Sequence, residues 1–77
     1  MFAVVHVLDV ASVRALVRSQ HYDLARAREA LTALRSRQPG KPYTIVRLYE
    51  PSRVGDVISG DEIEAGIADH DTRRVAG

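Results

Sequence analysis

The chain of 77 residues contains no cysteine, so no disulfide can staple its fold, and no thiolate can bind a metal or attack a substrate. Secreted domains of this size usually rely on disulfides, so the absence favours a cytoplasmic protein. The length predicts one domain, because chains divide into domains only at several times this length. The apolar start, Met1–Val10, is interrupted by His6 and Asp9 and has no basic residue in front of it. It therefore predicts neither a signal peptide nor a membrane span.

Motifs that carry catalysis are also missing. The sequence has no G-x-S-x-G nucleophile elbow, no Walker-type phosphate loop and no G-x-G-x-x-G turn. The three histidines, His6, His21 and His70, are scattered. The run Asp69–Asp71 offers three potential metal ligands. Consecutive side chains point in different directions, however, and a stable metal site needs further ligands from other parts of the chain. We therefore expect a protein that is not an enzyme, with no catalytic residue, no metal site, no cofactor and no small-molecule substrate.

The net charge of +1 conceals an uneven distribution of charge along the chain. Residues 1–50 carry eight basic and four acidic side chains, a net charge of +4, and residues 51–77 carry three basic and six acidic ones, a net charge of −3. This asymmetry is typical of a basic face that meets phosphates or acidic proteins. It also fits two parts of one compact domain that neutralise each other, which is the simpler interpretation.

Two strands are predicted at the start of the chain. The segment Phe2–Leu8 is short, β-branched and apolar on both faces, which indicates a central strand. Residues 12–20 fit either a strand, because their apolar residues alternate, or a short helix capped by Ser12. We favour the strand, since the alternation is regular and a helix has little room before the next one. The link that begins at Asp9 is then a hairpin turn.

A helix over Leu24–Arg37 is the clearest element of the sequence. Asp23 stands where an N-cap acceptor is needed, and alanine and leucine dominate the segment. The segment Tyr43–Glu50 follows, and its alternating pattern predicts a strand. The apolar stripe of the helix consists of Leu24, Ala27, Leu31 and Leu34.

The last third of the chain has weaker signals. Residues 52–60 have room for a short strand around Val57 and Ile58. The pair Ser59 and Glu62 forms a capping-box pattern, which predicts a short acidic helix with Ile63 and Ile67 as its apolar residues.

These elements predict an α+β fold of the ββαβ type, with a small antiparallel three-stranded sheet, one long helix on one face and a short C-terminal helix. The domain spans residues 1–70, and residues 71–77 form a flexible tail because they carry one large apolar residue. We expect the long helix to cover the face that consists of Ala3, Val5, Val7, Val13, Ala15, Val17, Thr44, Val46 and Leu48.

The opposite face of the predicted sheet mixes apolar, aromatic and arginine side chains, namely Phe2, Val4, His6, Leu8, Arg14, Leu16, Arg18, Tyr43, Ile45, Arg47 and Tyr49. It is too apolar to lie in water and too charged for a core, so something should cover it. We expect the C-terminal helix to cover part of it and a partner to contact the rest. The predicted partner-binding residues are Arg14, Arg18, Arg28, Arg35, Tyr43, Arg47 and Tyr49.

Tyrosine and arginine are enriched at hot spots of protein interfaces, which favours a protein partner or a homodimer. The leading hypothesis is a small binding protein that occupies a surface of its partner, as phage-encoded inhibitors of host machinery such as anti-CRISPR proteins do. The alternative is a small nucleic-acid-binding module, because an exposed sheet with aromatic and arginine side chains can stack bases and hold phosphates. The near-neutral charge of the whole chain argues against this alternative.

Overall fold

A computed structural model of the chain describes residues 1–67. The elements in chain order are β1 (Phe2–Asp9), β2 (Arg14–His21), α1 (Leu24–Arg37), β3 (Tyr43–Leu48), β4 (Val57–Ile58), the 3-10 helix η1 (Gly60–Glu62) and β5 (Ile63–Ile67).

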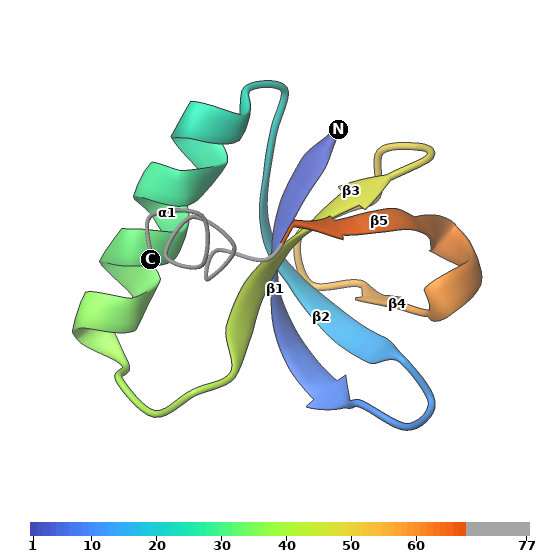
Figure 1. Cartoon of the computed structure of the whole chain (residues 1–77), viewed down its shortest axis with the longest axis horizontal. Helices are drawn as coiled ribbons and strands as arrows, with labels where there is room; N and C mark the ends of the chain where they lie inside the picture. The colour runs from blue at the N-terminus through green and yellow to red at the C-terminus, as the bar shows by residue number, and fades with distance from the viewer. Residues whose placement is uncertain (68–77) are drawn as a thin grey trace, which may run out of the picture.

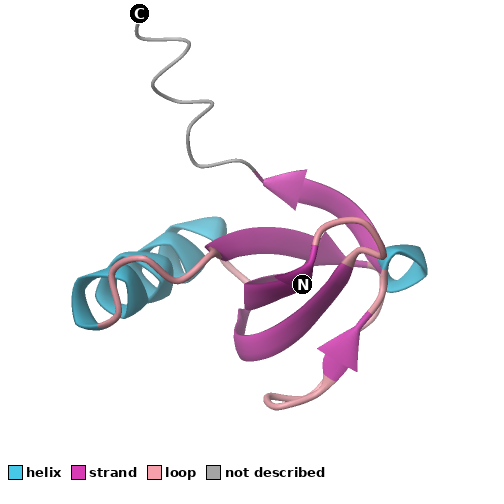
Figure 2. Ribbon diagram, turned by 90° about the horizontal axis from the view of Figure 1, so that it is seen from below, coloured by secondary structure: helices cyan, strands magenta, loops and turns pink. Residues whose placement is uncertain are grey.

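The five strands form one antiparallel sheet in the order β4-β2-β1-β3-β5. The sheet is curled, with α1 on one side and the β4–η1–β5 segment on the opposite side (Figures 1 and 2). The prediction of a three-stranded ββαβ sheet is therefore wrong. Its three strands are present with β1 in the centre, but β4 and β5 extend the sheet at both edges.

The predicted C-terminal helix is a strand. The capping box forms as the sequence indicates: Ser59 N–H donates to the Glu62 carboxylate over 3.0 Å. The helix nevertheless ends after a single 3-10 turn, and the chain continues as β5, which pairs with β3. The spacing of Ile63 and Ile67 fits both a helix face and a strand face, so it could not decide between them.

The helix α1 has the predicted bounds and cap. The Asp23 carboxylate accepts a hydrogen bond of 3.0 Å from the backbone N–H of Ala25. At the other end Arg35 and Arg37 lie in the last turn, where positive charge interacts favourably with the helix dipole. The buried residues of the helix are Ala27, Leu31 and Leu34, all from the predicted stripe.

The helix packs on the sheet face opposite to the one expected. Its stripe contacts the cluster of Val4, Tyr43 and Ile45, with Phe2 at the margin. Since both faces of β1 are apolar, the alternation of the strands does not indicate which face the helix takes. The face that we expected the C-terminal helix and a partner to cover is thus covered by α1.

The other face of the sheet forms a second core inside the curl. Ala3, Val5, Ala15, Val17, Val46 and Leu48 lie on this concave face, and Ile58 of β4 and Ile63 of β5 pack against them. Ile58 comes from a segment for which the sequence allows a short strand, and Ile63 from a segment that the sequence predicts as a helix. This concave core replaces the expected contact between α1 and the same face.

The predicted flexible tail, residues 71–77, lies outside the described residues, as does the end of the predicted domain. Within residues 1–67, no helix combines the length and the apolar character that crossing a bilayer requires.

Candidate functional site

The concave side of the sheet opens at one end into an apolar cleft of about 400 Å3. The cleft lies beside the hairpin that joins β1 to β2, which is at the lower end of the sheet in Figure 1. Asp9, Arg14 and Thr44 also border it. The apolar lining includes Val5, Val7, Val13, Ala15, Val46 and Ile63.

The hairpin beside the cleft carries three exposed aliphatic side chains, which we call the hairpin tip: Leu8, Val10 and Val13. Their exposed fractions are 50%, 81% and 47%. Val10 and Val13 also line the apolar cleft, so the exposed apolar surface continues from the hairpin into the concave side. Contiguous apolar surface of this kind marks interaction sites in folded proteins.

The turn is held by Asp9. Its carboxylate accepts hydrogen bonds from the backbone N–H of Ala11 over 3.0 Å and from the hydroxyl of Ser12 over 2.7 Å. These bonds, the one from Ser12 first, lower the pKa of Asp9 below its usual value of 3.8. The local network fixes the turn, as aspartate side chains commonly do.

Val13 closes this turn in the left-handed region, at a φ of 51°. A β-branched residue rarely adopts this conformation, which costs on the order of 1–3 kcal/mol. The side chain of Val13 lies over Gly60, where an added Cβ would stand 3.3 Å from the Cβ of Val13. The strained residue is therefore the part of the hairpin tip that contacts η1.

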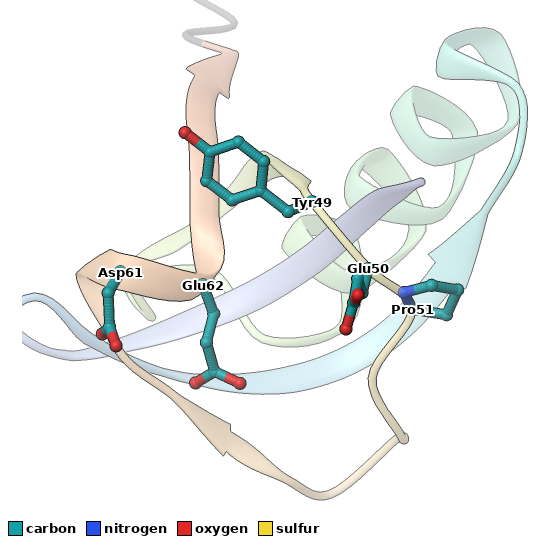
Figure 3. Close-up of a pocket in the computed structure, with 5 residues that line it drawn as sticks. All are labelled: Tyr49, Glu50, Pro51, Asp61 and Glu62. Carbon is teal, nitrogen blue, oxygen red and sulfur yellow. The ribbon is translucent and has the colours of Figure 1, made fainter.

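A second pocket of about 230 Å3, which we call the acidic pocket, lies between the end of β3 and η1 (Figure 3). Tyr49, Glu50, Pro51, Asp61 and Glu62 line it, and the ring of Tyr49 points away from the carboxylates.

Two of the three carboxylates in this pocket have a structural role. Glu62 accepts from Ser59 N–H, and Asp61 accepts from the Ser59 hydroxyl, which lowers the pKa of Asp61 below 3.8. No group of three or more potential metal ligands occurs among residues 1–67. Asp61 and Glu62 in the acidic pocket therefore cap η1.

The third pocket, of about 220 Å3, lies between α1 and β2. Arg18 and Arg37 stand at this pocket, and Ser19, Ala30, Ala33 and Leu34 complete the lining. The Ser19 hydroxyl is engaged with His21 Nε2 at 2.9 Å. The two arginines make the pocket basic. None of its polar side chains is buried, since no polar or charged residue is buried among residues 1–67.

The predicted partner-binding residues do not form one surface. Arg14 borders the apolar cleft, Arg18 the basic pocket and Tyr49 the acidic pocket. Arg28 lies exposed on α1. These positions are distributed over separate sides of the molecule.

Three of the predicted residues are engaged within the fold. Tyr43 is 4% exposed, and its hydroxyl donates to the Gln38 side chain over 2.8 Å, so it is a core residue. Arg35 donates to the backbone carbonyl of Tyr43 over 3.3 Å. Arg47 forms an ion pair of 3.2 Å with Glu64 across β3 and β5. Tyr43 thus contributes to the core, whereas Arg35 and Arg47 are exposed residues that contact neighbouring parts of the fold.

The hairpin tip was missed by reasoning from the sequence. Its signal is visible in the sequence: the turn Asp9–Val13 contains two valines, where turns usually contain glycine, asparagine or serine. An apolar side chain in a turn cannot be explained by the strand pattern.

Comparison with known proteins gives no relative: no family model matches the chain, and neither curated proteins nor solved structures show a significant match.

Proposed function

We propose that the protein is a non-enzymatic binding domain whose contact surface is the apolar cleft together with the hairpin tip. The observation that carries the proposal is the exposure of Val10, at 81%, directly beside a cleft with an aliphatic lining. Burying such a side chain contributes about 1.5–3 kcal/mol, which a partner gains when it covers the surface.

The chemistry of this surface favours a protein partner. Its lining is aliphatic, and its charged groups, Asp9 and Arg14, stand at the border. An apolar centre with a polar rim is the usual arrangement of a protein interface. The partner should therefore present aliphatic side chains to the cleft, surrounded by charges that complement the rim.

The alternative of nucleic-acid binding loses its main support. It relied on an exposed sheet face with aromatic residues, but Tyr43 is buried beneath α1 and Phe2 packs at the margin of the same cluster. Base stacking on this face would require the helix to leave the sheet. We therefore do not propose a nucleic-acid partner.

The test compares two valine substitutions, Val10→Asp and Val54→Asp. Both side chains are exposed, at 81% and 65%, but Val54 lies in the loop before β4 and does not line the apolar cleft. The tagged full chain captures its protein partners, a second copy included, from a nuclease-treated lysate. Each captured protein is identified, purified and titrated against the three forms by calorimetry.

We expect the wild type and Val54→Asp to bind with the same affinity and Val10→Asp to bind about 10-fold or more weakly. Equal affinity of the two variants would contradict the proposal. If the captured partner is an enzyme, its activity with and without the protein shows whether binding inhibits it.

A further inference from the structure

The surface proposed above contains both a protruding and a receiving part. Val10 protrudes at the hairpin tip, and the apolar cleft lies immediately beside it, since Val10 also borders the cleft. The cleft, at about 400 Å3, has the size of pockets that hold small ligands, so it has room for aliphatic side chains. A protrusion and a receiving cleft that adjoin each other on one face are self-complementary.

We propose that the partner at this surface is a second copy of the chain, related by a two-fold axis, with Val10 of each copy seated in the apolar cleft of the other. The inference rests on the proposed function, because it uses the same surface. Two-fold association fills both clefts and covers both hairpin tips at once. Head-to-tail association would leave one protrusion and one cleft open at the ends.

Charge at the border of the cleft supports a second copy as the occupant. Asp9 and Arg14 face each other as the last pair of the β1–β2 register, and both border the cleft. Asp9 and Arg14 are both exposed. The Asp9 carboxylate accepts one hydrogen bond at each oxygen from its own hairpin, which leaves lone pairs for a further donor, and Arg14 forms no ion pair within residues 1–67. Two copies thus bring one acidic and one basic group each to the rim, which allows opposite charges to meet across the axis.

The strained backbone of Val13 agrees with this arrangement. Strain at a residue that contributes to a binding surface is retained when the bound state uses its geometry. At φ 51° the Val13 side chain lies both over Gly60 and in the cleft lining. The conformation keeps an aliphatic wall where the second copy would insert Val10.

The first test is sedimentation equilibrium of the purified full chain over a wide range of concentration. We expect a reversible monomer–dimer equilibrium for the wild type and for Val54→Asp. Val10→Asp should raise the dimer dissociation constant about 100-fold or more, because a two-fold axis makes each substitution act twice. Circular dichroism verifies that both variants remain folded, and Val10→Ser provides an uncharged second variant.

The second test uses the absence of cysteine from the sequence. Chains with Val10→Cys are mixed with chains that carry Thr44→Cys, a position that borders the cleft. Under mild oxidation we expect a disulfide-linked pair on a non-reducing gel, and no such pair when Val54→Cys replaces Val10→Cys. Equal cross-linking from positions 10 and 54 would overturn the inference.

The outcomes separate this inference from the proposed function. If the wild type stays monomeric at every concentration, the inference that the partner is a second copy is wrong. The proposed function is still supported in that case if the capture of another protein depends on Val10. A dimer that is insensitive to Val10→Asp, for example one paired along the outer edge of β5, overturns the second copy at this surface. If capture is insensitive as well, the proposed function falls with it.

Discussion

At the scale of one residue, Val13 adopts a strained backbone conformation that lowers the stability of the turn, and its side chain lines the apolar cleft. Its φ of 51° is a conformation that asparagine and glycine adopt at much lower cost than valine. Asp9 fixes the turn, and the glycine at position 60 lets the Val13 side chain approach the backbone of η1. The residue type at position 13 therefore serves the aliphatic lining of the cleft better than it serves the turn.

Replacement of Val13 by asparagine tests this interpretation. Asparagine tolerates the left-handed region, so the midpoint of thermal unfolding, followed by circular dichroism, should not fall. Self-association should weaken about 10-fold, since a polar side chain replaces part of the cleft wall. The control is Val10→Asn, where no positive φ is relieved and self-association is lost without any gain in stability. A clear fall in the midpoint of Val13→Asn would contradict the strain argument.

At the scale of elements, two short turns depend on carboxylates that accept local hydrogen bonds. Asp9 and Asp61 both have a pKa lowered below 3.8, mainly by the hydroxyls of Ser12 and Ser59. For a carboxyl group whose pKa is lower in the folded state, the stabilisation is complete above the unfolded pKa and is lost as the pH falls through the folded one. We therefore expect both turns to weaken only below about pH 3.8.

Carbon-detected NMR titration of the aspartate carboxyl groups measures this directly. In Ser12→Ala the pKa of Asp9 should return towards 3.8, and that of Asp61 should keep its wild-type value. In Ser59→Ala the pKa of Asp61 should return towards 3.8, and that of Asp9 should keep its wild-type value. The exposed helix residue Ser36 provides the control, because Ser36→Ala should move neither pKa. A pKa of Asp9 that does not respond to Ser12→Ala would show that another group stabilises its charge.

The elements that the sequence predicted correctly depend on local chemistry. The helix α1 follows from Asp23 as its cap and from an apolar stripe that only a helix brings to one side. The segment after Ser59 has an equally good local signal, the capping box, but its continuation is decided by the distant partner strand β3. Pairing with β3 overrides the helical start, and the local signals for a strand, the β-branched Ile63 and Ile67 and the glycine at position 66, are weaker than the capping box.

At the scale of the whole molecule, the sheet has an apolar core on each face. The side chain of Val4 belongs to the helix side, and that of Val5 belongs to the concave side, and both are fully buried. Because β1 alternates between two buried faces, its sequence predicts a central strand but not which face the helix covers. The location of the apolar cleft depends on that choice, which is why the candidate surface could not be placed from the sequence.

The two cores should act as independent packing units within one cooperative fold. Ile45 lies in the helix-side cluster and Ile58 in the concave cluster, each 1% exposed, and the sheet separates the clusters. We expect Ile45→Val and Ile58→Val each to lower the free energy of unfolding by about 0.5–1.5 kcal/mol. Since the two side chains share no cluster, the double variant should lose the sum to within about 0.5 kcal/mol.

Urea denaturation of the four proteins, followed by circular dichroism and by tyrosine fluorescence, measures these values. Both probes should report one shared transition for every protein, because the strands β1 and β3 contribute to both cores. A coupling energy well above 0.5 kcal/mol would mean that the sheet transmits packing changes from one face to the other. Separate transitions for the two probes would mean instead that the domain does not unfold in a single cooperative step.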